Sequence, residues 1–226
     1  MSMNFGREQA LLRQRLTKKG SAERIAEQTA RHGDCMKFLG ADKQEVTAAA
    51  NDLTELYPEM GRAQMTAFVR TLWATKTYEL RCVGIEILAT RAELLEPQDH
   101  PFVESLLQEA SIESLSARIA EGVLGPLTYK NKKLWKNLSQ LAKSADEQLR
   151  RAAVRAARIP VAADAKVFSR FEELVTPLLN ESDALLQEVI DDVLQAATEV
   201  NNEAVAAFAQ EHDRQTTRNL LRRQDY

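Results

Sequence analysis

Apolar residues recur along the chain with the 3.6-residue period of amphipathic helices, and no convincing run of alternating β-branched residues appears. Glycine and proline divide this pattern into segments, and we expect helices to stop at Gly40, Pro58–Gly61, Pro97, Gly125–Pro126 and Pro160. The expected helices span residues 7–17, 21–32, 43–56, 61–74, 77–92, 99–110, 111–124, 131–143, 145–158, 164–179, 183–198, 201–211 and 213–224. The sequence therefore predicts an all-α protein.

Side chains that cap helix N-termini precede several of these segments. Ser144 and Glu147 have the spacing of a capping box, and Asp42 with Glu45 has a related arrangement. The expected caps of two later segments are Asp164 and Asn201.

The later segments pair as antiparallel hairpins that start near residues 61, 99, 131, 164 and 201. These starts are separated by somewhat fewer than 40 residues, close to the ~40-residue repeat of helical-hairpin solenoids. No linker is long or polar enough to divide the chain. We therefore expect one α-α superhelix over residues 1–226, in which the helices of residues 1–40 are candidates for an N-terminal cap.

The charge distribution changes this picture more than the net charge of −3 does. Residues 130–158 hold nine basic and two acidic side chains, whereas residues 171–213 hold eleven acidic side chains and no Lys or Arg. Such polarity is typical of a binding face that attracts a charged partner. A dipolar fold without a partner is the alternative.

Within the basic block, Arg151, Arg155 and Arg158 have helical spacing and are expected to form one stripe. Three guanidinium groups in a row suit an array of phosphates, because each offers a planar fork of donors that stays charged. Lys136 and Lys143 are expected to support this contact with DNA. The structural alternative is a solvated face above a buried stripe of alanines.

Several classes of protein are not indicated by the sequence. No segment approaches the ~18 apolar residues of a membrane span, and the N-terminus has no signal-peptide core. Cys35 and Cys82 lie far apart, as expected of a reduced cytoplasmic protein without structural zinc, and the three histidines are scattered. We therefore expect no metal and no cofactor, and a monomer is the default.

Four other features have plain structural explanations. Trp73 is expected in the core, whereas Trp135 fits a core position and a partly exposed one equally well. Asp191–Asp192 is expected at the surface rather than in a carboxylate site. Arg214, Arg218 and Arg222 would offset the dipole of the last helix or extend the basic stripe.

An ordered set of motifs resembles the DNA alkylation repair proteins of the AlkD type, which are HEAT-like helical-repeat proteins. The matching segments are KFLGADKQEV (37–46), LWATKTYELRCVGIEIL (72–88), HPFVESLL (100–107), Ile119 with Leu124–Gly125, LRRAAV (149–154) and the DRQTTRNLLR tail. The resemblance runs from about residue 36 to residue 224. It implies a HEAT-like solenoid with a basic concave face, on which Arg151 corresponds to a phosphate-contacting arginine.

The resemblance fails at the active site of the family. Active members carry a Trp and, four residues later, an Asp, and the matching positions here are Glu113 and Ala117. A second family Trp falls at or next to Asp192. An oxocarbenium-like transition state is stabilised by a nearby negative charge, which Ala117 does not supply.

Three hypotheses follow. The first is a DNA-binding protein of this family that grips the backbone through its basic face without excising bases. The second is a glycosylase for N3- or N7-alkylated purines in which Glu113 or Glu121 replaces the missing Asp. The third is a protein-interaction scaffold, for which the acidic residues of 171–213 would suit a basic partner.

Overall fold

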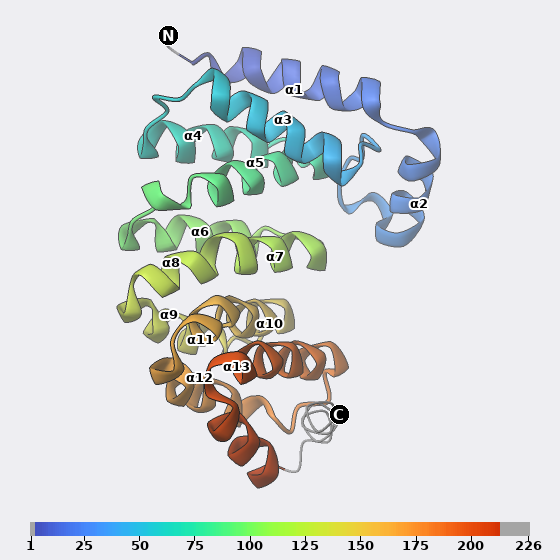
Figure 1. The fold of residues 1–226 in the computed structure, drawn as a ribbon. Coiled ribbons are helices and arrows are strands. Elements are labelled where there is room, and N and C mark those ends of the chain that lie inside the picture. The colour runs from blue at the N-terminus through green and yellow to red at the C-terminus, as the bar shows by residue number, and fades with distance from the viewer. Residues whose placement is uncertain (1–2, 213–226) are drawn as a thin grey trace. The chain divides into compact units, whose positions relative to one another are not determined.

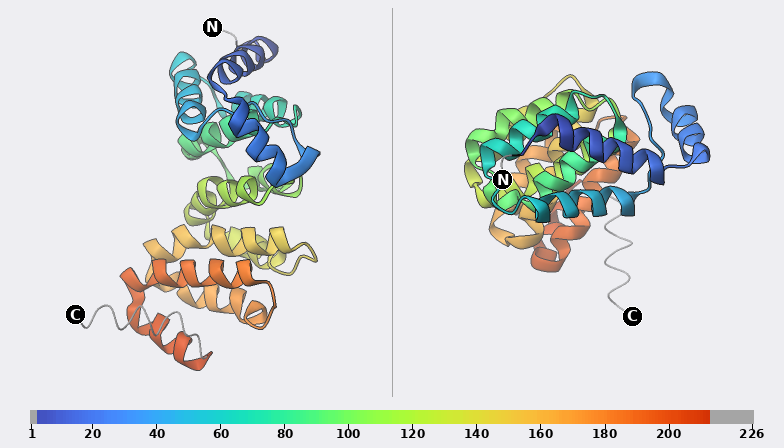
Figure 2. Two further views of the ribbon diagram at one scale, coloured as in Figure 1. Left: turned by 90° about the vertical axis from the view of Figure 1, so that its right-hand side faces the viewer. Right: turned by 90° about the horizontal axis from the view of Figure 1, so that it is seen from above.

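The computed structural model describes residues 3–212 and is helical throughout, apart from one isolated parallel bridge between Lys37 and Thr77 (Figure 1, Figure 2). The described residues form two compact units, which divide between Arg118 and Ile119. The predicted all-α fold is confirmed, whereas a single domain stays a prediction. Within residues 3–212, no helix is both long and apolar enough to cross a membrane.

The first unit is built from helices joined by short connections. They are α1 (Phe5–Lys19), α2 (Ala22–His32), α3 (Lys43–Leu56), α4 (Arg62–Trp73), α5 (Tyr78–Thr90), α6 (His100–Gln108) and α7 (Glu113–Ile119), with short 3-10 turns at Gly33–Cys35, Ala92–Leu94 and Pro97–Asp99. The Asp42 carboxylate accepts a hydrogen bond from the backbone N–H of Glu45 at 2.9 Å, so this predicted cap of α3 is confirmed.

Trp73 lies in the core of the first unit, as predicted. Its side chain is fully buried together with Phe68 and Leu72. The guanidinium of Arg81 lies 4.5 Å from the centroid of the Trp73 ring, and its Nε donates a hydrogen bond to the Trp73 carbonyl oxygen at 3.1 Å. Burial lowers the pKa of Arg81. The aromatic face and the carbonyl oxygen together compensate part of that desolvation.

A buried carboxylate fixes the connection between α2 and α3. Glu79, on α5, is fully buried and accepts hydrogen bonds from the backbone N–H groups of Leu39 at 2.9 Å and Gly40 at 2.7 Å. Burial raises the pKa of Glu79, and these backbone donors oppose that rise. Gly40 has a φ of +73°, and a Cβ there would lie 2.5 Å from the Ser21 carbonyl oxygen, so this position requires glycine.

The second unit begins with a wide, π-helical turn. Its elements are η4 (Ala120–Leu124), α8 (Gly125–Lys130), α9 (Trp135–Leu141), α10 (Glu147–Ala156), α11 (Arg158–Ala163), α12 (Phe168–Val175) and α13 (Ala184–Glu211), with short 3-10 turns at Lys132–Leu134, Ala165–Val167 and Thr176–Leu178. Asp164 caps the turn that follows it, because its side chain accepts a hydrogen bond from Lys166 N–H at 3.0 Å. The break expected before residue 201 is a kink inside α13, where Asn201 has a φ of −152° and a ψ of 57°.

Two predicted helix ends are wrong. Gly125–Pro126 and Pro160 lie in the first turns of α8 and α11 instead of ending the preceding helices. A proline is compatible with a first helical turn, where the missing N–H would have no acceptor within the helix. Prolines therefore begin two short helices here. The predicted helix 213–224, with Arg214, Arg218 and Arg222, lies outside the described residues.

Candidate nucleic-acid interface

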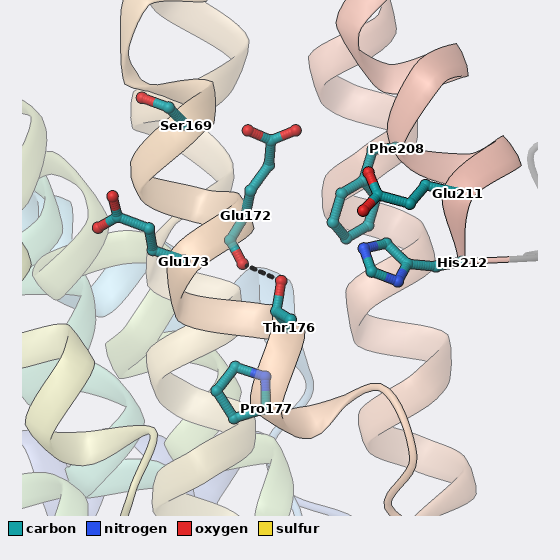
Figure 3. A pocket seen from close by; sticks show the side chains of 8 residues that line it. All are labelled: Ser169, Glu172, Glu173, Thr176, Pro177, Phe208, Glu211 and His212. Carbon is teal, nitrogen blue, oxygen red and sulfur yellow. Dashed lines mark hydrogen bonds between the residues drawn. The ribbon is translucent and has the colours of Figure 1, made fainter.

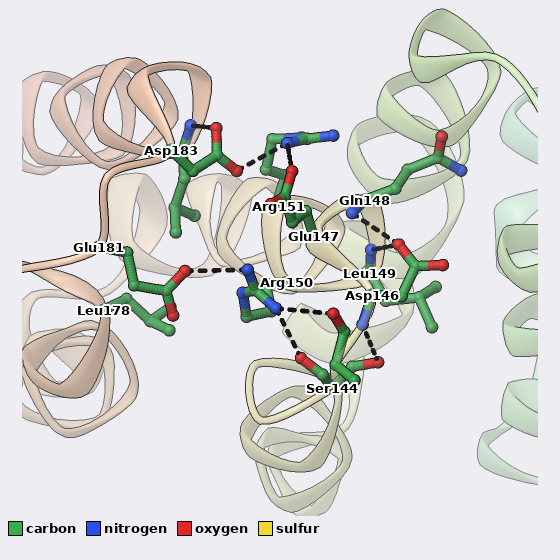
Figure 4. A network of polar contacts seen from close by, with 12 residues as sticks. Ser144, Asp146, Glu147, Gln148, Leu149, Arg150, Arg151, Leu178, Glu181 and Asp183 are labelled. Atoms are coloured by element: carbon green, nitrogen blue, oxygen red, sulfur yellow. Dashed lines mark hydrogen bonds and ion pairs between the residues drawn. The ribbon is translucent and has the colours of Figure 1, made fainter.

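Helix α10 carries Arg151 and Arg155, whereas Arg158 is the first residue of α11, so the predicted stripe of three arginines on one helix is wrong. The apolar face of α10 is buried, with Leu149, Ala152 and Ala153 packed inside the second unit. The predicted capping box of Ser144 and Glu147 is wrong, because the cap of α10 is Asp146. The Asp146 carboxylate accepts hydrogen bonds from the N–H groups of Gln148 at 2.8 Å and Leu149 at 3.4 Å (Figure 4).

Arg151 is largely buried and held by carboxylates. Its side chain is 14% exposed, and Nη1 lies 2.6 Å from Asp183 Oδ2 and 3.5 Å from Glu147 Oε2 (Figure 4). Asp183 also caps α13, because its side chain accepts the N–H of Leu186 at 3.0 Å. The charge of Arg151 is therefore balanced inside the folded unit.

The neighbouring Arg150 forms polar contacts with two segments of the second unit. Its guanidinium contacts Glu181 Oε2 at 3.0 Å and donates to the carbonyl oxygens of Ser144 at 2.8 Å and Ala145 at 3.1 Å (Figure 4). The sequence pattern counted this arginine in the basic block without assigning it a partner. Its contacts give it a structural role, because it joins the start of α10 to the segment before α13.

Arg155 and Glu121 form a pair that the sequence did not predict. Nη1 of Arg155 lies 3.3 Å from Glu121 Oε1, and the two side chains are 16% and 48% exposed. The structure thus joins a predicted phosphate-binding residue to a predicted replacement for the catalytic Asp. Glu121 lies on the π-helical η4, so the continuous α-helical register assumed between Glu113 and Glu121 does not hold through this segment.

The exposed cations of the basic block are Lys130, Lys132, Lys133, Lys136, Lys143 and Arg158. Lys136, Lys143 and Arg158 are exposed, and none has a carboxylate within ion-pairing distance among the residues that the structure describes. Lys136 lies in the first turn of α9, and Lys143 lies just past the end of that helix. These three cations are therefore available to an external anion.

The remaining predicted residues have less specific surroundings. Glu113 lies in the first turn of α7 in the first unit, and both Glu113 and Ala117 are half-buried. Trp135, for which the sequence left two interpretations open, is buried with 4% exposure. Asp191 is half-buried and Asp192 exposed. Within residues 3–212, no group of three or more His, Cys, Asp or Glu side chains is arranged to hold a metal ion.

An acidic hollow of about 580 Å³ lies between α12 and the end of α13. It is lined by Glu172, Glu173 and Glu211, with the rings of Phe208 and His212 at one side (Figure 3). Burial raises the pKa of Glu172, and the nearby charge of Glu211 adds to the rise. This hollow is the concave part of the acidic region predicted from residues 171–213.

Replacing Asp183 with Ala is expected to lower the free energy of unfolding by about 1–3 kcal/mol, because the change removes a cap and a charge-assisted hydrogen bond. Burial opposes ionisation of Asp183, but the Leu186 N–H and the Arg151 guanidinium hold its pKa below the ordinary value. The stabilisation is therefore present above the ordinary aspartate pKa of about 3.9 and is lost as pH falls towards the lowered value.

Urea unfolding of wild type and Asp183→Ala at several pH values measures this effect. The difference should be full at pH 7 and should shrink as the pH falls below about 4. Asp183→Asn is the control, because it keeps an oxygen that can cap the helix but removes the charge. A difference that does not change with pH would contradict the assignment to an ionised Asp183.

Comparison with known proteins shows which family the chain belongs to. The sequence profile of a family described as "DNA alkylation repair enzyme" matches residues 12–223. A solved structure described as "Predicted DNA alkylation repair enzyme from Enterococcus faecalis" has a TM-score of 0.73 and 12% identity, covering 88% of this chain and 95% of the other. This likeness concerns the fold alone, and a search of curated protein sequences gives no match. The profile covers most of the chain, and the chain therefore belongs to the DNA alkylation repair enzyme family.

Proposed function

We propose that this protein is a DNA-binding member of its family that holds the phosphate backbone through the exposed cations of the second unit. The observation that carries the proposal is the availability of Lys136, Lys143 and Arg158 in a chain that belongs to a DNA repair family. Backbone contacts position a protein on DNA without reading its sequence. Binding with little sequence preference is therefore expected.

Arg151 and Arg155 are expected to contribute less to DNA binding than these three exposed cations. Both guanidinium groups are already paired with carboxylates, Asp183 and Glu121 respectively. They can contact a phosphate by exchanging carboxylate for phosphate, which makes their contribution smaller than that of an unpaired cation. The primary contacts are therefore assigned to Lys136, Lys143 and Arg158.

Salt dependence provides the test. Each phosphate contact contributes about 0.9 to the slope of log K against log salt, so Lys136→Gln, Lys143→Gln and Arg158→Gln combined should reduce the slope by about 2.7. Fluorescence anisotropy of a labelled, undamaged duplex at several salt concentrations measures this slope. The control is Lys132→Gln, because Lys132 Nζ is already paired with Asp164 at 2.9 Å. Wild-type protein that shows no salt-sensitive binding would contradict the proposal.

A second candidate function is excision of alkylated purines, with Glu121 as the carboxylate that stabilises positive charge on the sugar. The pairing of Glu121 with Arg155 favours this candidate, because the ion pair at 3.3 Å holds the carboxylate in a fixed position, as such chemistry needs. Half of the Glu121 side chain is exposed, so a bound nucleotide could reach it. Glu113 is the alternative carboxylate. The residues matching the Trp and Asp of active relatives are Glu113 and Ala117, which is the reason that DNA binding without excision is proposed first.

A further inference from the structure

Helix α1 carries a strong positive charge. It contains five basic residues and one acidic residue, Glu8. The Glu8 carboxylate is buried and accepts a hydrogen bond from the Tyr57 hydroxyl at 2.9 Å, so it points into the fold. The solvent-facing side of α1 is therefore basic.

Two of the five cations are neutralised by α3. Arg15 Nη1 lies 2.6 Å from Asp52 Oδ2, and Lys19 Nζ lies 3.2 Å from Glu45 Oε1. Both carboxylates belong to α3, so these pairs join two neighbouring helices. They have an evident structural role.

Arg13 and Lys18 do not take part in these pairs. Arg13 is half-buried, and its Nη2 donates to the Thr77 hydroxyl at 3.3 Å. Lys18 is exposed. Neither has a carboxylate within ion-pairing distance in the part of the chain that the structure describes. No structural partner explains the charge of these two side chains.

Both cations line a hollow on α1 that adjoins a second hollow at the C-terminal end of α4. This α1–α4 groove consists of two adjoining hollows of about 550 and 500 Å³, which share Gln9. The other hydrogen-bonding side chains at its surface include Gln14 on α1 and Thr71 and Thr75 on α4. The described lining residues include no Asp or Glu, and the third cation among them, Arg70, is already paired with Glu109 at 2.8 Å.

We propose that the α1–α4 groove binds the phosphodiester backbone of nucleic acid, with Arg13 and Lys18 contacting phosphates. The inference rests on the proposed function and adds to it a contact surface in the first unit. Amide and hydroxyl side chains supply many phosphate and sugar contacts in DNA complexes.

The composition of the groove also distinguishes nucleic acid from a membrane surface. Peripheral membrane helices insert large apolar side chains beside their cations. The described residues that line the α1–α4 groove include Gly6, Ala10 and Ala74 as their apolar members, and none of these is large. Such a surface fits a hydrated polyanion better than the acyl region of a bilayer.

Paired variants of the full chain test the inference. Arg13→Gln combined with Lys18→Gln removes two contacts, and the slope of log K against log salt should decrease by about 1.8. The matched control is Arg15→Gln combined with Lys19→Gln, which changes the charge of the same helix equally but acts on cations paired with α3. Anisotropy titrations of a labelled duplex measure the slope, and thermal unfolding confirms that each variant is folded.

The outcomes separate the inference from the proposed function. A smaller slope for the groove variant alone supports the inference. If wild type binds DNA and the two variants have the same slope, the inference is overturned and the proposed function stands. If wild type does not bind DNA, both are overturned. Binding to phosphatidylserine vesicles that needs Arg13 and Lys18, without an effect of these residues on DNA binding, would also overturn the inference.

Discussion

Duplex DNA that carries 7-methylguanine is expected to keep its damaged base when it is mixed with excess protein. Departure of the base builds positive charge on the sugar, and a fixed carboxylate stabilises that charge. The sequence resemblance predicts Ala117 at the position of the family Asp, and loss of such a group typically costs on the order of 10²–10⁴ in rate. The same resemblance predicts that both family tryptophans are replaced, which would remove a further stacking energy of roughly 1–3 kcal/mol per base. Single-turnover release of free base, measured against duplex alone, provides the test.

The same experiment with the variants Glu113→Gln and Glu121→Gln tests the second candidate function. Base release by wild type that disappears in Glu121→Gln but persists in Glu113→Gln would assign the carboxylate role to Glu121. The reverse result would assign it to Glu113. Either result would contradict binding without excision, whereas salt-sensitive binding without release would support it.

The second large effect concerns stability. Replacing Glu79 with Ala is expected to lower the free energy of unfolding by about 2–4 kcal/mol, because the backbone N–H groups of half-buried Leu39 and buried Gly40 lose their acceptor. The loss of stability is expected to appear first as local opening of the connection between α2 and α3. Hydrogen exchange at the amides of Leu39 and Gly40 measures that opening directly.

Two controls accompany this prediction. Glu79→Gln keeps one carbonyl oxygen as an acceptor and should cost less than Glu79→Ala. Glu59→Ala changes an exposed glutamate and is expected to stay within about 0.5 kcal/mol of wild type. Equal exchange rates at Leu39 and Gly40 in wild type and Glu79→Ala would show that the carboxylate does not hold this loop.

Local periodicity predicted most helices of the fold because it reports which face of a segment is buried. It could not decide whether Pro126 and Pro160 end one helix or begin the next, since a proline is compatible with both positions. The cap of α10 was missed by two residues for a similar reason. Ser144 and Asp146 are both good capping residues, and local sequence does not say which of them is used.

The candidate site was predictable as a set of cations but not as an arrangement of charges. The spacing of Arg151 and Arg155 placed them correctly on one helix. Their partners, Asp183 and Glu121, lie 32 and 34 residues away along the chain. Such pairs arise from tertiary packing, which the period of a single helix does not report. Exposure of Lys136, Lys143 and Arg158 likewise became known only from the folded unit.

The two tryptophans of this chain are distributed one to each compact unit, and both are buried. Indole emission shifts to longer wavelength when water reaches the ring, so each unit contains its own natural fluorescent reporter. Trp73→Phe would leave Trp135 to report on the second unit, and Trp135→Phe would leave Trp73 to report on the first. Unfolding curves of these two variants would therefore reveal whether the units melt together or in sequence, without any added label.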